Sequence, residues 1–283
     1  MPTLGFHCHG LVDFEEAILS NRLQHGEFYN LPEEDFLPIK ERIAKHGLEV
    51  SVHCPLVRLS WYPKPPTWAF LCDVDEAKRE LNFRMITDTL ERARGLPASH
   101  VVAHFPSPST TDASGFSAAE MEEIAWRSAS RLAELSEKYE VSIHVEGFGP
   151  TPLLSVPFLQ KVFAGFPPLR YCFDTGHMML AMQRDGIDMY DFAQGLAPHV
   201  GSMHLWNTRH ADDYQAFRHI PVHPSQRPEQ GWVDIERVLR LIVPESPAVT
   251  VIFESGLHYP EALGGHDYRD GVKWVRDLLA GLS

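Results

Sequence analysis

Residues 171–178 read YCFDTGHM, an apolar run that ends at Asp174 and passes through a Thr-Gly turn to His177. This pattern predicts a buried strand that delivers two ligand-type side chains at its carboxyl end. Strand ends of this kind carry the catalytic groups of α/β barrels. The same residues are also compatible with an aspartate that caps the next helix beside a surface histidine, so the interpretation depends on whether the pattern recurs.

The pattern recurs along the whole chain of 283 residues, in which short apolar segments alternate with longer segments of helical periodicity. The expected strands are residues 3–9, 27–29, 48–54, 100–104, 141–146, 169–174, 201–204 and 249–254. Eight strands at roughly 35 residues per unit favour a (βα)8 TIM barrel, an α/β fold, over an open doubly wound sheet. Because no linker-like change in composition occurs, residues 1–283 are predicted to form a single domain.

Local signals place helix starts and one long loop between these strands. Ser117 and Glu120 have the spacing of a capping box, and Asp234 precedes an apolar stripe of helical period. Residues 268–282 are predicted to close the chain as a helix. Residues 55–68 are rich in proline and too irregular for a helix or a strand, which indicates a functional loop.

Composition restricts the classes of function. The formal net charge of −13 argues against broad binding to nucleic acid, which depends on clustered Lys and Arg. No run of 18 apolar residues and no leader segment is present, so membrane spanning and secretion are both disfavoured. The four cysteines show no CxxC pair, which favours a reducing, cytoplasmic location. Sixteen histidines are notable because histidine is the commonest metal ligand.

Six ligand-type residues stand at the ends of successive predicted strands. They are His53, His104, Glu146, Asp174, His204 and Glu254. Strand ends of a barrel converge on one mouth, so these side chains are expected to face a common point. Any one of them has an ordinary structural explanation, but burying several carboxylates together is costly unless a cation or a proton neutralises them. A divalent metal ion is therefore the simplest explanation of the set.

These residues belong to motifs that carry a family resemblance over essentially the whole chain. The motifs are Gly5-Phe6-His7, His53-Cys54-Pro55, His104-Phe105-Pro106, Glu146-Gly147, Asp174-Thr175-Gly176-His177, His204-Leu205-Trp206-Asn207, His223 followed by Gly231, and Glu254-Ser255. In this order they resemble the xylose isomerase-like TIM-barrel superfamily. That superfamily includes sugar and sugar-phosphate isomerases and epimerases and the type-2 AP endonucleases.

The resemblance implies one to three divalent metal ions. The principal ligand set would be Glu146, Asp174, His204 and Glu254, which as three carboxylates and one imidazole suits Mn, Zn, Mg or Co. The endonuclease branch adds a second metal site, to which His53 and His104 correspond, with Glu146 bridging. Two ligands of a third site in that branch correspond to His177 and His223.

The sequence departs from the endonuclease pattern in the third site and in the loop after the third strand. Pro221 stands where the third site has an aspartate, so a third ion requires a substitute such as Asp213 or Glu229. His219 is an alternative to His223. The tyrosine and asparagine expected after the His-x-Pro motif are Leu56 and Arg58 here, which weakens the interpretation as a DNA-binding enzyme.

The favoured hypothesis is a metal-dependent isomerase or epimerase acting on a sugar, a sugar phosphate or a similar polyol. Glu146 and Glu254 would be the acid/base pair on opposite sides of this small-molecule substrate. His7, Arg209 and Trp206 are expected to contact the substrate. The loop tryptophans Trp61 and Trp68 are further candidates for substrate contact, with loop packing as the alternative.

Three other interpretations stay open. A phosphoesterase related to the type-2 AP endonucleases would use a second ion at His53, His104 and Glu146. A barrel that binds metal without turnover is also compatible with the sequence. His7 and His9 lie on one face of the first strand, as in metal-dependent amidohydrolases and polymerase-associated phosphoesterases, but the other motifs do not follow that order. The sequence leaves the substrate, the metal and the oligomeric state open.

Overall fold

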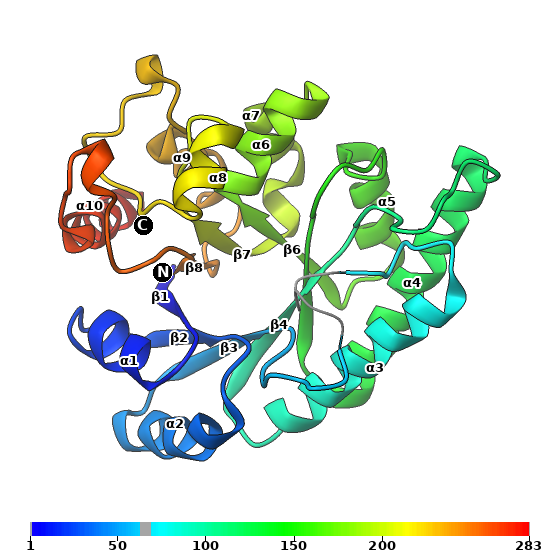
Figure 1. The fold of residues 1–283 in the computed structure, drawn as a ribbon, viewed down its shortest axis with the longest axis horizontal. Coiled ribbons are helices and arrows are strands. Elements are labelled where there is room, and N and C mark those ends of the chain that lie inside the picture. The colour runs from blue at the N-terminus through cyan, green and yellow to red at the C-terminus, as the bar shows by residue number, and fades with distance from the viewer. Residues whose placement is uncertain (1, 63–68, 283) are drawn as a thin grey trace. The chain divides into compact units, whose positions relative to one another are not determined.

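The computed structural model of the protein describes residues 2–62 and 69–282. Its eight strands form a closed barrel in which each strand neighbours the next one along the chain. Figure 1 labels the strands and colours them in chain order. This topology confirms the predicted (βα)8 TIM barrel. The strands are β1 Thr3–Cys8, β2 His25–Phe28, β3 Glu49–His53, β4 Ala98–His104, β5 Ser142–Glu146, β6 Leu169–Asp174, β7 Val200–Leu205 and β8 Thr250–Phe253.

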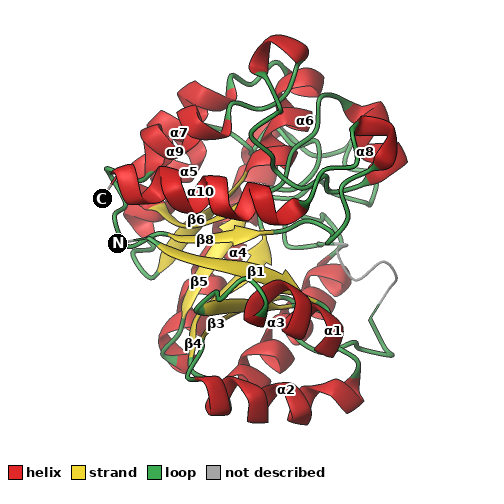
Figure 2. Cartoon of the chain, turned by 90° about the vertical axis from the view of Figure 1, so that its left-hand side faces the viewer, coloured by secondary structure: helices red, strands yellow, loops and turns green. Residues whose placement is uncertain are grey.

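The helices follow the strands along the chain. Figure 2 shows the helices in red and the strands in yellow. They are α1 Leu11–Asp13, α2 Glu33–His46, α3 Glu76–Ala93, α4 Ala118–Tyr139, α5 Val156–Gly165, α6 Thr175–Asp185, α7 Met189–Leu196, α8 Ala211–Phe217, α9 Ile235–Ile242 and α10 Tyr268–Leu282. Within the described residues, no helix has the length and apolar character needed to cross a membrane.

The predicted helix starts are confirmed in detail. Ser117 and Glu120 form the reciprocal capping box at the start of α4, and Asp234 accepts a hydrogen bond from the Arg237 backbone N–H at 2.9 Å before α9. The segment after β1 is helical but irregular, because the short α1 is followed directly by a π-helix, Phe14–Leu19. There the Ser20 backbone N–H reaches back five residues to the Glu15 carbonyl at 3.1 Å.

The chain folds as two compact units that are interrupted in sequence. The first comprises Met1–Cys8, Val12–Gly26 and Cys172–Ser283, and the second comprises His9–Leu11 and Glu27–Tyr171. Both units contribute strands to the closed barrel. The interpretation of residues 1–283 as a single domain stays a prediction.

In the first unit, β8 pairs in parallel with both β1 and β7. Phe6 of β1 lies opposite Phe253 of β8, and their ring centroids are 5.8 Å apart. Tyr268 of α10 packs edge-on against Phe6 at 5.9 Å. Buried aromatic rings of this size contribute a large share of the core, so they hold the carboxyl ends of these strands in fixed positions.

In the second unit, β4 pairs in parallel with β3 and β5, and His104 lies in register with Glu146. The polar side chain of Asp73 ties the segment before α3 to the loop after β4. Its carboxylate oxygen Oδ2 accepts hydrogen bonds from the Thr110 backbone N–H at 2.8 Å and from the Thr110 hydroxyl at 2.7 Å. The loop that follows His104 is therefore anchored by a buried carboxylate.

The predicted functional loop at residues 55–68 lies partly outside the described residues, and with it Trp68. In the described part, Leu56 and Val57 are buried, whereas the guanidinium of Arg84 lies 4.1 Å from the ring of Trp61. The four cysteines, Cys8, Cys54, Cys72 and Cys172, are buried and free of disulfide bonds, as the absence of a CxxC pair predicts.

Candidate metal centre

Asp174 ends β6 and also caps the helix that follows directly. Its Oδ1 accepts a hydrogen bond from the His177 backbone N–H at 2.5 Å, so Thr175 and Gly176 form the first turn of α6. The Thr-Gly turn expected between strand and ligand is therefore wrong as a separate element. The ligand and helix-cap interpretations of Asp174 are compatible. Its Oδ1 atom caps the helix, while its Oδ2 atom faces His204.

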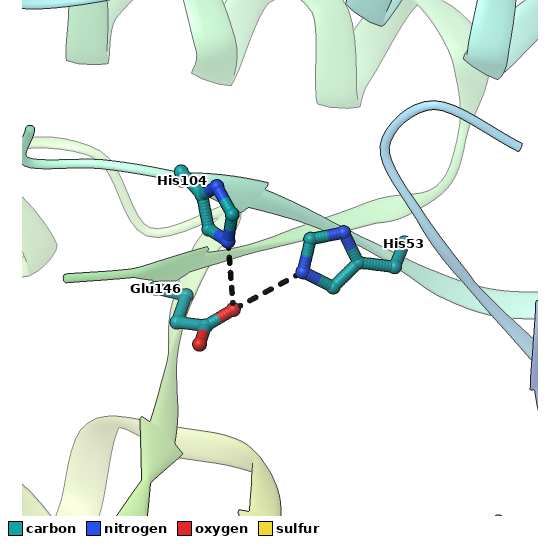
Figure 3. A group of neighbouring side chains, drawn as sticks. All are labelled: His53, His104 and Glu146. Carbon is teal, nitrogen blue, oxygen red and sulfur yellow. Dashed lines mark hydrogen bonds and ion pairs between the residues drawn. The ribbon is translucent and has the colours of Figure 1, made fainter. Parts of the chain in front are cut away.

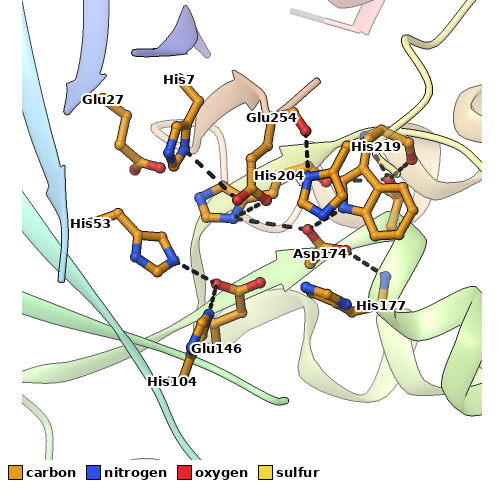
Figure 4. Close-up of polar contacts among 12 residues, drawn as sticks. His7, Glu27, His53, His104, Glu146, Asp174, His177, His204, His219 and Glu254 are labelled. Atoms are coloured by element: carbon orange, nitrogen blue, oxygen red, sulfur yellow. Dashed lines mark hydrogen bonds and ion pairs between the residues drawn. The ribbon is translucent and has the colours of Figure 1, made fainter. Parts of the chain in front are cut away.

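Three ligand-type side chains of the first unit meet at the ends of β6, β7 and β8. The Nδ1 atom of His204 lies 3.1 Å from Oε2 of Glu254 and 3.9 Å from Oδ2 of Asp174 (Figure 4). The ligand atoms of all three residues lie within 4.8 Å of one another. Asp174 and His204 are 2% and 0% exposed, respectively, so this cluster is held inside the protein.

Backbone pairing places Glu254 beside His204. Glu254 directly follows β8, and its backbone N–H donates to the Leu205 carbonyl of β7 at 3.1 Å. Burial raises the pKa of Glu254, but the charges of His204 and His219 outweigh this effect and hold that pKa well below its usual range. Nδ1 of His7, on β1, lies 3.8 Å from Oε1 of the same carboxylate. Glu254 is consequently an anion surrounded by imidazoles.

A second cluster lies in the second unit, at the ends of β3, β4 and β5. Oε2 of Glu146 lies 3.2 Å from Nε2 of His53 and 3.5 Å from Nε2 of His104 (Figure 3). The imidazole rings of the two histidines are 4.9 Å apart and nearly perpendicular. The three ligand atoms lie within 4.8 Å of one another, as a shared cation would require.

Aromatic rings that the sequence does not single out flank this second cluster. Tyr29 packs edge-on against His53 with centroids 5.1 Å apart, and Phe148 stacks on His104 at 4.7 Å. Phe148 directly follows the Glu146-Gly147 motif, and this adjacency is the one feature of the sequence that indicates its place beside the cluster. These rings fix the planes of the two imidazoles.

The residues expected at a third metal site lie in different surroundings. His177 packs edge-on against His219, with ring centroids 5.8 Å apart. His223 instead stacks on His266 at 4.1 Å and lies 2.7 Å from the Ser225 hydroxyl through Nδ1. Burial and the charge of His266 lower the pKa of His223. Across residues 2–62 and 69–282, neither His177 nor His223 belongs to a group of three ligand atoms.

The suggested substitutes for the missing third-site aspartate are also engaged elsewhere or exposed. Both Asp213 oxygens accept hydrogen bonds from the Arg209 guanidinium, at 2.6 and 2.9 Å. Glu229 lies in an exposed turn. Arg209 also lies over the Trp232 ring at 5.2 Å, so the group predicted to contact substrate is held in place by two neighbours.

The donor chemistry of both clusters fits a divalent cation. Each combines imidazole nitrogen with carboxylate oxygen, which suits Mn, Zn, Mg or Co. Asp174 is buried and Glu254 is partly buried, and their negative charges favour a nearby cation because removing two neighbouring carboxylates from water is otherwise costly. Glu146, which the resemblance assigns to the principal ligand set, belongs to the second unit, and its part in that set stays a prediction.

The closed barrel with acids and histidines at its strand ends defines the class of protein as an α/β barrel with candidate metal centres. The chain belongs to the xylose isomerase-like TIM barrel family, whose family model matches residues 12–278. No curated protein sequence matches it.

Solved structures with the same fold cover nearly the whole chain. A D-tagatose 3-epimerase-like protein is 16% identical, with a TM-score of 0.72 over 99% of this chain and 98% of its own. The 3-keto-D-glucoside 4-epimerase from E. coli is 13% identical, with a TM-score of 0.67 over 98% of this chain and all of its own. D-psicose 3-epimerase from Clostridium cellulolyticum H10 is 14% identical, with a TM-score of 0.63 over 98% of this chain and 99% of its own. At these identities the likeness shows the fold.

Proposed function

We propose that the protein is a divalent-metal-dependent isomerase or epimerase acting on a sugar, a sugar phosphate or a similar polyol. The observation that carries this proposal is the cluster of buried Asp174 and His204 with partly buried Glu254, at consecutive strand ends with ligand atoms within 4.8 Å of one another. Family membership supports it, as do the names of similar structures, several of which are sugar epimerases.

The roles of the residues follow from their charges. A divalent ion, when bound, supplies Lewis acidity that polarises a substrate carbonyl and acidifies the neighbouring C–H group. In this proposal Glu254 is an ionised carboxylate at neutral pH and is the group that accepts the proton from carbon. In this proposal Glu146 is the second carboxylate of the acid/base pair, and His7 orients Glu254 from 3.8 Å.

We propose a small polar molecule as the partner and a reducing compartment, the cytoplasm, as the location. The net charge of −13 and the replacement of the endonuclease residues by Leu56 and Arg58 argue against nucleic acid as substrate. Four buried cysteines without disulfide bonds support the reducing compartment.

The experiment measures the exchange of substrate hydrogen with solvent deuterium in protein whose metal content is controlled. Chelator-treated protein is reloaded with Mn²⁺ and incubated with a panel of ketoses in D2O, and deuterium incorporation beside the carbonyl is followed by NMR. The loaded wild type should exchange at least one ketose. Asp174→Ala should not exchange, whereas Asp185→Ala, an exposed aspartate at the end of α6, should match the wild type. A wild type that binds Mn²⁺ and exchanges none of the ketoses would contradict the proposal.

A second candidate function, a two-metal phosphoesterase, is favoured by the His53, His104 and Glu146 cluster. One Glu146 oxygen lies within 3.5 Å of both imidazoles, which is compatible with a carboxylate that bridges two ions. Metal analysis separates the candidates, because two or more ions per chain with cleavage of bis-nitrophenyl phosphate would favour the phosphoesterase. One ion without that cleavage would favour the isomerase.

A further inference from the structure

The indole of Trp206 is the second hydrogen-bond donor to Asp174. Its Nε1–H donates to Oδ2 of the carboxylate at 2.7 Å. The backbone N–H of His177 donates to Oδ1 of the same carboxylate (Figure 4). Trp206 is 0% exposed, so water does not compete for this bond. Both oxygens of Asp174 are therefore oriented by the protein itself.

The backbone of Trp206 is fixed to the start of α6. The Thr175 hydroxyl donates to the Trp206 carbonyl at 2.6 Å, and the Trp206 backbone N–H donates back to that hydroxyl at 3.3 Å. Thr175 directly follows Asp174 in the chain. The indole and the carboxylate are thus held on two strand ends that are tied together at their backbones.

Gly176 leaves the space that the indole occupies. A Cβ atom at this position would lie 2.2 Å from Cε2 of Trp206 and 2.3 Å from Cδ2, which no rearrangement short of moving the ring would relieve. Gly176 lies within α6, where glycine is unfavourable compared with alanine. The close approach of the ring explains why glycine stands there.

His219 also packs against the indole. Its imidazole stacks on Trp206 with centroids 4.2 Å apart and planes within 7° of each other. Nδ1 of His219 lies 2.8 Å from the Glu254 carbonyl oxygen, which anchors the imidazole to the end of β8. Gly176 and His219 therefore both lie in close contact with the indole and restrict it to the orientation that reaches Asp174.

We infer that Trp206 is a positioning residue that orients the Asp174 carboxylate for a divalent cation, rather than a surface for substrate. The inference rests on the proposed metal site. A hydrogen bond to a charged ligand from outside the coordination sphere fixes its direction, and the loss of such a partner typically lowers metal affinity about 10–100-fold. Gly176 and His219 act through the indole, because they determine where its N–H points.

The test is the affinity of chelator-treated protein for Mn²⁺, measured by titration calorimetry. Trp206→Phe keeps a ring in contact with Gly176 and His219 but removes the donor, so the affinity should fall about 10–100-fold. The matched control is Trp232→Phe, another buried tryptophan, which packs with Ile220 and Tyr259. It should keep the wild-type affinity even where its thermal stability falls as much as that of Trp206→Phe, which separates positioning from packing.

Gly176→Ala provides an independent variant that retains the indole N–H. The added methyl group displaces the ring, so the affinity should fall as it does in Trp206→Phe, and the double variant should lose no more than the weaker-binding single variant. Paramagnetic Mn²⁺ should also quench tryptophan fluorescence less in Trp206→Phe than in the wild type or the Trp232→Phe control.

The outcomes distinguish this inference from the proposed function. If Asp174→Ala loses the ion while Trp206→Phe and Gly176→Ala both bind as tightly as the wild type, the metal site stands and the positioning role is refuted. If the wild type binds no divalent ion, the metal site and the positioning role are both refuted.

Discussion

Replacing Asp73 with asparagine should destabilise the protein in a way that depends on pH. Burial raises the pKa of Asp73, but hydrogen bonds from Thr111, Thr110 and Asp75 outweigh this effect and lower that pKa from 3.8 to about 2. At about 1.36 kcal/mol per unit, this difference corresponds to about 2 kcal/mol of folding free energy. Asp73 is 0% exposed, so little of this energy is screened by water.

The sign follows from the lowered pKa. The stabilisation is present above about pH 4, where the carboxylate is ionised in both the folded and the unfolded chain, and it is lost as the pH falls towards 2. In Asp73→Asn the side-chain NH2 group replaces one carboxylate oxygen. This group cannot accept hydrogen bonds, so the variant cannot satisfy the same set of N–H and O–H donors. The variant should therefore lose at least about 2 kcal/mol at pH 7 and progressively less below pH 4.

The assay is urea denaturation of both proteins at pH 7, 4 and 3, with the free energy of unfolding compared at each pH. Asp112→Asn serves as the control because Asp112 is exposed, and its free energy of unfolding should stay close to that of the wild type. A loss at pH 3 as large as the loss at pH 7 would refute the reasoning, since it would show that the carboxylate charge contributes nothing.

The remaining predictions concern the metal centres. Asp174→Ala and His204→Ala should each abolish divalent-ion binding at the principal site, because the coordination sphere becomes incomplete. Full metal content in either variant, measured by elemental analysis, would show that the site is assigned to the wrong residues. Glu254→Gln should keep the wild-type circular dichroism spectrum and lower turnover by orders of magnitude, because an amide cannot act as a base. Unchanged turnover would show that Glu254 has only a structural role. The double change of His53 and His104 to alanine should leave the principal ion bound and weaken substrate affinity if one ion performs catalysis. A drop from two ions to one, with loss of bis-nitrophenyl phosphate cleavage, would favour the phosphoesterase.

The barrel and the positions of the strand ends could be predicted from the sequence because both leave local signals. An apolar run that stops at a ligand-type residue marks each strand, and β6 has the predicted bounds Leu169–Asp174, while the other strand bounds differ by at most two residues. The pairing of His104 with Glu146 follows from the same strand ends once the barrel closes in chain order.

What the sequence could not predict depends on contacts between distant segments. Asp174 and Trp206 are 32 residues apart, and nothing in either motif indicates that the indole N–H meets the carboxylate. The surroundings of His219 and His223 also could not be read from the sequence, because two histidines four residues apart fit the same family position. His219 packs against His177, whereas His223 stacks on His266.

The register of His104 and Glu146 has a consequence for how this sequence can tolerate insertions. Each lies at the final position of its strand, and neighbouring residues of a strand point to opposite faces. One residue inserted within β4 would advance the chain by about 3.3 Å and turn the His104 imidazole to the other face of the sheet. Insertions in the segment between α3 and β4 change neither the direction nor the register of that side chain. Length variation in natural or designed variants should therefore accumulate in the connections before the strands, while the strand interiors keep a constant residue count.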